Sequence, residues 1–334
     1  MTKEICRNWK ELEAEIHAPS WPVSIDYARL DEVMGEHTSK ALASTSHLPP
    51  IPGAGSKNPF VAASYILTGN IWNFHFKTPG QPPYRVANPE NPEKPFEGFI
   101  GFWHKLYQRC GERVITADML RPHVASVEAM RDFFHDLADI PLPELRQRCG
   151  ADYVRQLDRY YEGSSLFILR DVASGGAFRA YNGGGGLVEV LTRRFVTAYG
   201  QDYRTFDGRT YAFFKRARLV AMSFHQYAIS SGGRMITPLE DADDLGPVVD
   251  YQIPRILRAL GVLVYSPALE TAIEQGMEIP RGSTEEVMIR AASAVAFAHW
   301  MEEKNIPGWQ LDSYLFSISR GLPNKAHYTK TSDY

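Results

Sequence analysis

Asp250 is the residue of this sequence whose type and position are best suited to chemistry. It follows the apolar pair Val248-Val249 and precedes a predicted helix that begins near Ile253. A carboxylate in this position can cap the helix, because its oxygen atoms accept free backbone N–H groups. It can also be a catalytic group, because the helix dipole and those N–H groups favour its ionised form even where water is largely excluded. The residues alone leave both uses open.

An ionised carboxylate beside an apolar wall is suited to the cleavage of a sugar bond. It can stabilise a developing oxocarbenium ion, act as a nucleophile, or take a proton from an attacking water. The helix that follows is predicted by apolar residues at i, i+3, i+4 and i+7, which are Ile253, Ile256, Leu257 and Leu260. Pro254 suits its first turn, and Gly261 suits the position after its last.

Two further segments carry cations on predicted helices. Lys215 and Arg218 lie three residues apart, on a face other than the apolar one, and form either a solvated pair or a clamp for one phosphate. Arg290 lies among small apolar residues, where an unpaired charge would be costly. Glu286 stands four residues before it, the favourable order for an ion pair, which favours a structural role for both residues.

The segment from Asn70 to Lys77 has the alternation of a strand with one buried face. Its aromatic residues, Trp72, Phe74 and Phe76, alternate with Asn73 and His75. Tyr84 to Val86 would be its partner strand in a small antiparallel sheet. The aromatic rings are either core residues or, together with Asn73, a surface that recognises a planar base.

The rest of the chain predicts a mainly α fold with a small antiparallel β element. Residues 1–45 are expected to be helical with a break at Pro19 to Pro22, and residues 47–59 to be a loop. Further helices are predicted at 99–110, 125–137, 142–161, 187–199, 211–228, 253–260, 267–275, 284–303 and 309–320. Ser266 and Ser283 are the expected caps of two of these helices.

The length of 334 residues predicts one compact unit over residues 1–334. The alternative is two intimate subdomains: residues 1–98, an N-terminal helical segment with the small sheet, and residues 99–334, the helical catalytic region. Gly183 to Gly186 suggests a phosphate loop, but it lacks the Gly-Lys-Ser/Thr ending and a preceding strand, which favours a flexible connection.

Composition excludes several classes of function. The net charge of −3 and the sparse basic residues argue against a long nucleic acid as partner. No apolar run is long enough to span a membrane, and the first residues lack the apolar core of a signal peptide, so a cytoplasmic protein is expected. The three cysteines and the scattered histidines match neither a disulfide framework nor a zinc site. We expect chemistry without a metal or an organic cofactor.

The sequence resembles the queuosine salvage proteins in four ordered segments of its C-terminal half. They begin at Phe213-Phe214-Lys215-Arg216-Ala217, Asp250-Tyr251-Gln252-Ile253-Pro254, Leu260-Gly261-Val262-Leu263 and Glu286-Val287-Met288-Ile289-Arg290. Weaker similarity upstream, at residues 72–76 and 96–99, extends the resemblance over most of residues 65–320. Members of this family release the base queuine from queuosine 5′-phosphate and leave ribose 5-phosphate. Their helical fold is similar to that of the helix-hairpin-helix DNA glycosylases.

The resemblance implies roles for individual residues. It makes Asp250 the catalytic carboxylate and Lys215 a candidate for the 5′-phosphate. The candidates for holding the base or ribose are Trp72, Asn73, Phe74 and Tyr251. Asp312 either meets the cationic amine of queuine or forms a core ion pair. The expected partners are therefore the nucleotide substrate and the queuine product.

Two alternatives remain open at the level of sequence. A DNA or RNA base glycosylase would share the fold and the aspartate, although the net charge of −3 argues against it. A non-catalytic carrier of queuine or queuosine would have the same pocket and would bind without forming product.

Overall fold

The computed structural model describes residues 2–4, 10, 12–13, 21–43, 51–175, 177–206, 209–233, 236–319 and 321–334. The fold is mainly α with small sheets, which confirms the predicted class. The helices of the first part are α2 Tyr27–Ala43, α3 Pro59–Gly69, η1 Asn70–Trp72, α4 Gly98–Cys110, α5 Ala117–Leu120, η2 Arg121–His123, α6 Val127–Phe134, α7 Pro143–Tyr161, α8 Leu166–Ala173 and α9 Leu187–Arg194. Those of the second part are the π-helical turn η3 Val196–Gly200, α10 Lys215–Ser230, η4 Ala242–Asp244, α11 Gln252–Ala259, α12 Pro267–Glu274, α13 Thr284–Lys304 and α14 Gly308–Ile318.

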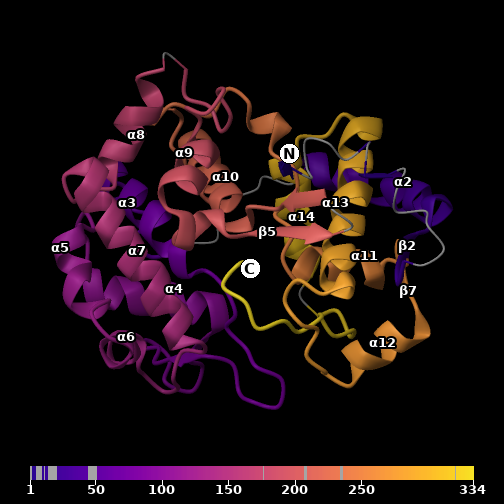
Figure 1. Cartoon of the computed structure of the whole chain (residues 1–334), viewed down its shortest axis with the longest axis horizontal. Helices are drawn as coiled ribbons and strands as arrows, with labels where there is room; N and C mark the ends of the chain where they lie inside the picture. The colour runs from indigo at the N-terminus through magenta and orange to yellow at the C-terminus, as the bar shows by residue number, and fades with distance from the viewer. Residues whose placement is uncertain are drawn as a thin grey trace.

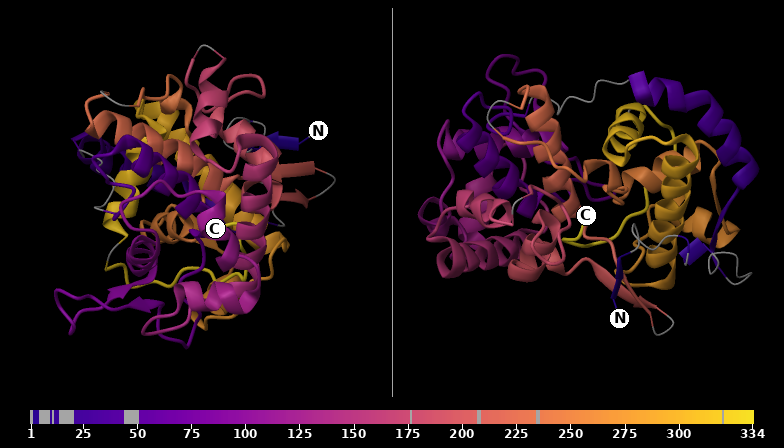
Figure 2. Two further views of the ribbon diagram at one scale, coloured as in Figure 1. Left: turned by 90° about the vertical axis from the view of Figure 1, so that its left-hand side faces the viewer. Right: turned by 90° about the horizontal axis from the view of Figure 1, so that it is seen from above.

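The apolar core forms two clusters, one on each side of the molecule. The first is built from residues between Ile51 and Val248, which include the buried faces of α3 to α10. The second joins α2 to the C-terminal helices α11, α13 and α14. In Figure 1 these two groups of helices lie side by side, with β5 between them, and the view from above in Figure 2 shows the same division. The prediction that residues 1–334 form one compact unit, with two subdomains at 1–98 and 99–334 as the alternative, stays a prediction.

The described residues form three small sheets, two of which join segments that are distant in sequence. β1 Thr2–Glu4 pairs in parallel with β6 Arg209–Ala212, which forms an antiparallel hairpin with β5 Tyr203–Phe206. β2 Val23–Ile25 pairs antiparallel with β7 Leu263–Tyr265, and this pairing fastens the N-terminal segment to the end of α11. β3 Arg85–Val86 pairs antiparallel with β4 Phe96–Glu97. No helix within the described ranges has the length and apolar character needed to cross a membrane.

The helices with clear apolar periodicity are confirmed. The predictions for 99–110, 142–161, 253–260, 267–275 and 284–303 match α4, α7, α11, α12 and α13 to within a residue or two. The serine caps are also confirmed, because Ser266 accepts the N–H of Leu269 and Ser283 that of Glu286. The predicted helix over 211–228 begins too early, since residues 209–212 form β6 and α10 begins at Lys215. Helices α3 and α8 were not predicted. Of the N-terminal prediction, residues 1, 5–9, 11, 14–20 and 44–50 lie outside the described residues.

The predicted strand over residues 70–77 is wrong. α3 continues into η1, and His75 has a φ of 47°, which lies in the left-handed region rather than in a strand. The buried guanidinium of Arg146 donates hydrogen bonds to three backbone carbonyls of this segment, those of Trp72, Phe74 and His75. The alternation of aromatic and polar side chains is therefore not a two-faced strand, and β3 pairs with β4 instead.

The glycine loop before α9 holds an internal anion. The carboxylate of Glu189 accepts the backbone N–H groups of Asn182, Gly184 and Gly186 at 2.7–2.9 Å. Backbone N–H groups before a helix do cradle an anion here, but the anion belongs to the protein itself. These three N–H groups are therefore satisfied within the protein.

Candidate active site

Asp250 lies one residue before Tyr251, the N-cap of α11, and its two carboxylate oxygens have different neighbours. Oδ1 accepts the N–H of Gln252 at 2.6 Å, so it satisfies one of the free donors of the helix N-terminus. Oδ2 lies 3.9 Å from Nζ of Lys215. The side chain is 15% exposed, which leaves Oδ2 accessible to a ligand.

Lys215 is the first residue of α10 and its side chain is buried. The preceding residue, Phe214, has a φ of 48°, and this left-handed turn directs the chain into the helix. Besides facing Asp250, Nζ donates to the carbonyl of Asn73 at 3.3 Å. Burial lowers the pKa of Lys215, while the neighbouring charge of Asp250 acts in the opposite direction. A buried ammonium with so few protein partners is available to an anionic ligand.

A cavity of about 1150 Å³ opens in front of this pair and is lined from both core clusters. Six of the predicted site residues line it: Asn73, Phe74, Lys215, Asp250, Tyr251 and Asp312. The volume is sufficient for a nucleotide, since pockets for small ligands occupy about 300–1,000 Å³. Aromatic, amide and charged groups thus surround the carboxylate, as a planar base attached to a sugar would require.

Asp312 approaches the same cavity from α14. Its Oδ1 accepts the N–H of Val248 at 3.0 Å. Burial raises its pKa to about 7; the Val248 N–H opposes this rise and the charge of Asp250 adds to it. A carboxyl that titrates near neutrality can donate a hydrogen bond when protonated and pair with a cation when ionised. Asp312 lines the cavity.

Trp72 does not line the cavity, contrary to the role that the resemblance gave it. Its side chain is fully buried in the first core cluster, where Nε1 donates to the carbonyl of Arg146 at 2.8 Å and the ring packs edge-on against Phe134. Trp72 is the last residue of the 3-10 turn η1, whereas Asn73 and Phe74, which follow it, line the cavity.

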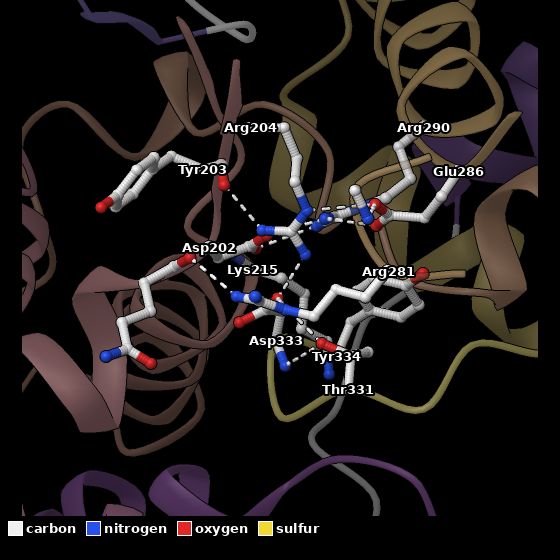
Figure 3. Close-up of polar contacts among 12 residues, drawn as sticks. Asp202, Tyr203, Arg204, Lys215, Arg281, Glu286, Arg290, Thr331, Asp333 and Tyr334 are labelled. Carbon is white, nitrogen blue, oxygen red and sulfur yellow. Dashed lines mark hydrogen bonds and ion pairs between the residues drawn. The ribbon is translucent and has the colours of Figure 1, made fainter. Parts of the chain in front are cut away.

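Glu286 and Arg290 form a buried ion pair on α13, which is the contact that their spacing predicted. Both are fully buried, and Arg290 Nη1 lies 3.4 Å from Glu286 Oε1. The stronger partner of Arg290 is Asp202, which accepts at 2.7 and 2.9 Å, and Figure 3 shows these groups close to Lys215. Arg290 also donates to the carbonyl of Val249 at 3.0 Å. These charges are therefore connected to both members of the Lys215–Asp250 pair.

Sequence reasoning missed the contribution of the C-terminal segment. Tyr328 packs against His75, with ring centroids 5.5 Å apart, and the ring of Tyr334 lies 4.3 Å from the Arg290 guanidinium. Both tyrosines line the cavity. Asp333 pairs with Arg204 and Arg281 and fixes the end of the segment in Figure 3. Polar residues in an irregular segment have no periodic pattern. The aromatic side chains were the feature of this segment that could have indicated a role in the site.

Other lining residues were also missed, namely Phe99, Gln226, Arg255 and Ser313. Gln226 Nε2 donates to Ser313 Oγ at 2.6 Å, which links α10 to α14 beside the cavity. Over the part of the chain that the structure describes, His, Cys, Asp and Glu side chains form no group of three or more that could hold a metal ion.

Comparison with known proteins places the chain among relatives of one kind. The profile of a family described as queuosine salvage protein matches residues 55–331, which is most of the chain. The chain belongs to the queuosine salvage protein family. The matched residues include four that line the cavity, Asn73, Lys215, Asp250 and Asp312.

Individual relatives in this family carry one name, queuosine 5′-phosphate N-glycosylase/hydrolase. The protein of Sphaerobacter thermophilus is 27% identical over 252 residues, which cover 75% of this chain and 72% of the relative. Those of Dictyostelium discoideum and Mus musculus are 31% and 28% identical over 157 and 170 residues. These shorter matches cover 46% and 50% of this chain and span 44% and 46% of the two relatives.

Proposed function

We propose that this protein hydrolyses the N-glycosidic bond of queuosine 5′-phosphate, with queuine and ribose 5-phosphate as products. The observation that carries the proposal is the Asp250 carboxylate, which faces a buried lysine in a cavity large enough for a nucleotide. The names of the relatives support the choice of substrate. The reaction consumes one water, whose hydroxyl joins C1′ of the ribose while its proton goes to the departing base.

Asp250 is the catalytic group of the proposed reaction. With C1′ opposite Oδ2, the carboxylate stabilises the positive charge that develops on the sugar as the bond to the base stretches. It then orients or deprotonates the attacking water. Oδ1 stays bound to the Gln252 N–H, so the helix holds the carboxylate in one orientation throughout.

Other residues of the cavity bind different parts of the substrate. Asn73, Phe74 and Tyr251 line the region for the base and ribose, where a ring can stack and an amide can read an edge. Asp312 pairs, when ionised, with the cationic amine of the queuine side chain. Lys215 holds the 5′-phosphate, whose charge would offset the burial of its ammonium.

Asp250→Asn tests the proposal directly. The amide oxygen can still accept the Gln252 N–H, so the helix start and the cavity should be preserved while the negative charge is lost. We expect the variant to bind substrate and to release no queuine, as measured by mass spectrometry after incubation with queuosine 5′-phosphate. Undiminished turnover would refute the role of Asp250.

The same experiment on the unmodified protein separates the alternatives. Binding of queuosine 5′-phosphate without product would identify a carrier. Salt-sensitive binding of a duplex, together with release of a base from it, would identify a polymer glycosylase.

A further inference from the structure

Asp202 is a buried carboxylate between the π-helical turn η3 and strand β5. It is 3% exposed and lies outside the cavity lining. Its Oδ2 accepts the backbone N–H of Lys215 at 2.9 Å. The guanidinium of Arg290 donates to both of its oxygens, at 2.7 and 2.9 Å. One carboxylate thus binds the first residue of α10 and the cation of α13.

The contact with Lys215 fixes the start of α10. The backbone carbonyl of Asp202 also accepts the N–H of Phe213 at 2.9 Å, so Asp202 holds the chain on both sides of the left-handed residue Phe214. A non-glycine residue in this region of backbone space persists only where its surroundings impose it. Asp202 therefore determines where the Lys215 side chain leaves the backbone.

The contact with Arg290 fixes the other member of the pair. Arg290 donates through Nη2 and Nε to the carbonyl of Val249, the residue before Asp250, at 3.0 and 3.2 Å. The rings of Phe213 and Tyr334 lie 3.8 and 4.3 Å from the guanidinium and hold it in place. Hydrogen bonds thus run without interruption from the Lys215 backbone through Asp202 and Arg290 to the backbone beside Asp250. Figure 3 shows Lys215, Asp202 and Arg290.

We propose that Asp202 is a positioning residue, which sets the separation between Lys215 Nζ and Asp250 Oδ2 through the Lys215 N–H and the Arg290 guanidinium. The kinetic consequence rests on the proposed function, while the geometric consequence does not. A purely structural role for Asp202 would be to neutralise Arg290, a task to which Glu286 contributes at 3.4 Å while it also pairs with Arg204 at 3.1 Å. The bond to the Lys215 N–H serves no such neutralisation.

Asp202→Asn keeps an acceptor for the Lys215 N–H but turns an amide toward Arg290. We expect kcat for queuosine 5′-phosphate to fall about 100-fold, because a displacement of about 1 Å in a catalytic group has an effect of this size. KM should rise as well, because the displaced Lys215 lines the cavity and binds the 5′-phosphate, but the fall in kcat should be the larger change. Asp202→Glu retains the charge but lengthens the side chain by one methylene, and should show a smaller fall in kcat.

Asp136→Asn is the matched control. Asp136 is also a largely buried carboxylate that pairs with a cation, Lys105, at 2.6 Å and accepts a backbone N–H, that of Ala87, at 2.9 Å. It lies in the first core cluster region, away from the cavity lining. Its loss should reduce the melting temperature and leave kcat per folded molecule unchanged.

A crystal structure of the Asp202→Asn variant supplies the readout that needs no substrate. The Nζ–Oδ2 separation should change by at least about 0.5 Å. An unchanged separation, or a fall in kcat equal to that of the control, overturns the positioning role. A changed separation in a protein that shows no release of queuine even unmodified would overturn the proposed function and leave the positioning role standing. If Asp202→Asn does not fold, Asp202→Glu carries both measurements, with a changed separation again expected.

Discussion

Replacement of Asp312 by asparagine should make the stability of the protein less dependent on pH. The Asp312 carboxyl accepts one backbone N–H, from Val248, and lies in the same cavity as Asp250 and Lys215. Burial raises its pKa from 3.8, the ordinary value, to about 7. The folded protein therefore holds a proton on this group at pH values at which the unfolded chain has released it.

The sign of the effect follows from this difference. Between pH 3.8 and about 7 the folded state binds more protons than the unfolded state at Asp312, so the free energy of unfolding falls as the pH rises. The contribution of the neutral carboxyl is fully present below the lower value and is lost as the pH rises through the upper one. An interval of about three pH units corresponds to about 4 kcal/mol, at about 1.4 kcal/mol per unit. The window from about pH 5 to about pH 8 covers about two of these pH units, so we expect a loss of about 2–3 kcal/mol across it.

Urea unfolding at these two pH values, followed by tryptophan fluorescence, measures the effect. The unmodified protein should lose more stability than Asp312→Asn as the pH rises, by the amount given above. Asp118→Asn is the control, because its carboxylate is 89% exposed and should leave the pH dependence unchanged. Parallel losses in the unmodified protein and in Asp312→Asn would refute the reasoning.

Two further predictions concern the lysine and a close helix contact. Lys215→Met should lower kcat/KM for queuosine 5′-phosphate about 10- to 100-fold more than for the nucleoside queuosine, because only the phosphorylated substrate loses a charged hydrogen bond. Equal losses for the two substrates would show that Lys215 acts on Asp250 alone. Gly308→Ala should lower the free energy of unfolding by about 1–3 kcal/mol, since a Cβ atom there would lie 1.9 Å from the carbonyl oxygen of Leu245. Gly35→Ala, in the interior of α2, adds a Cβ atom with nothing within 4 Å and should instead stabilise the protein. Urea unfolding measures both changes.

The helical part of the fold could be predicted from sequence because its signals are local. The apolar spacing of α11 and the serine caps of α12 and α13 depend only on neighbouring residues. The prediction of a strand over residues 70–77 was wrong for the opposite reason. The backbone of this segment follows the hydrogen bonds of Arg146, which lies more than 70 residues further along the chain, and no local pattern announces that partner.

The residues of the candidate site also fall into those that the sequence indicates and those that depend on long-range contacts. Asp250, Lys215 and Asp312 belong to segments that resemble a family, and the structure places them around one cavity. Asp202 stands in a loop without a motif, and its importance depends on Arg290, which is 88 residues away. Long-range partners of this kind become visible only when the helices that carry them have been packed together.

The two uses of Asp250 that the sequence left open do not compete. The capping and catalytic uses of a carboxylate exclude each other only if one of them needs both oxygen atoms. In Asp250 each oxygen atom has its own role. Oδ1 accepts the Gln252 N–H at 2.6 Å, while Oδ2 faces Lys215 Nζ at 3.9 Å and the cavity. The capping bond restricts rotation of the carboxylate, so Oδ2 is held toward the substrate before the substrate binds. It follows that Asp250→Asn and Asp250→Ala should differ in stability, because only asparagine retains the cap, and should be equally inactive, because neither retains the charge.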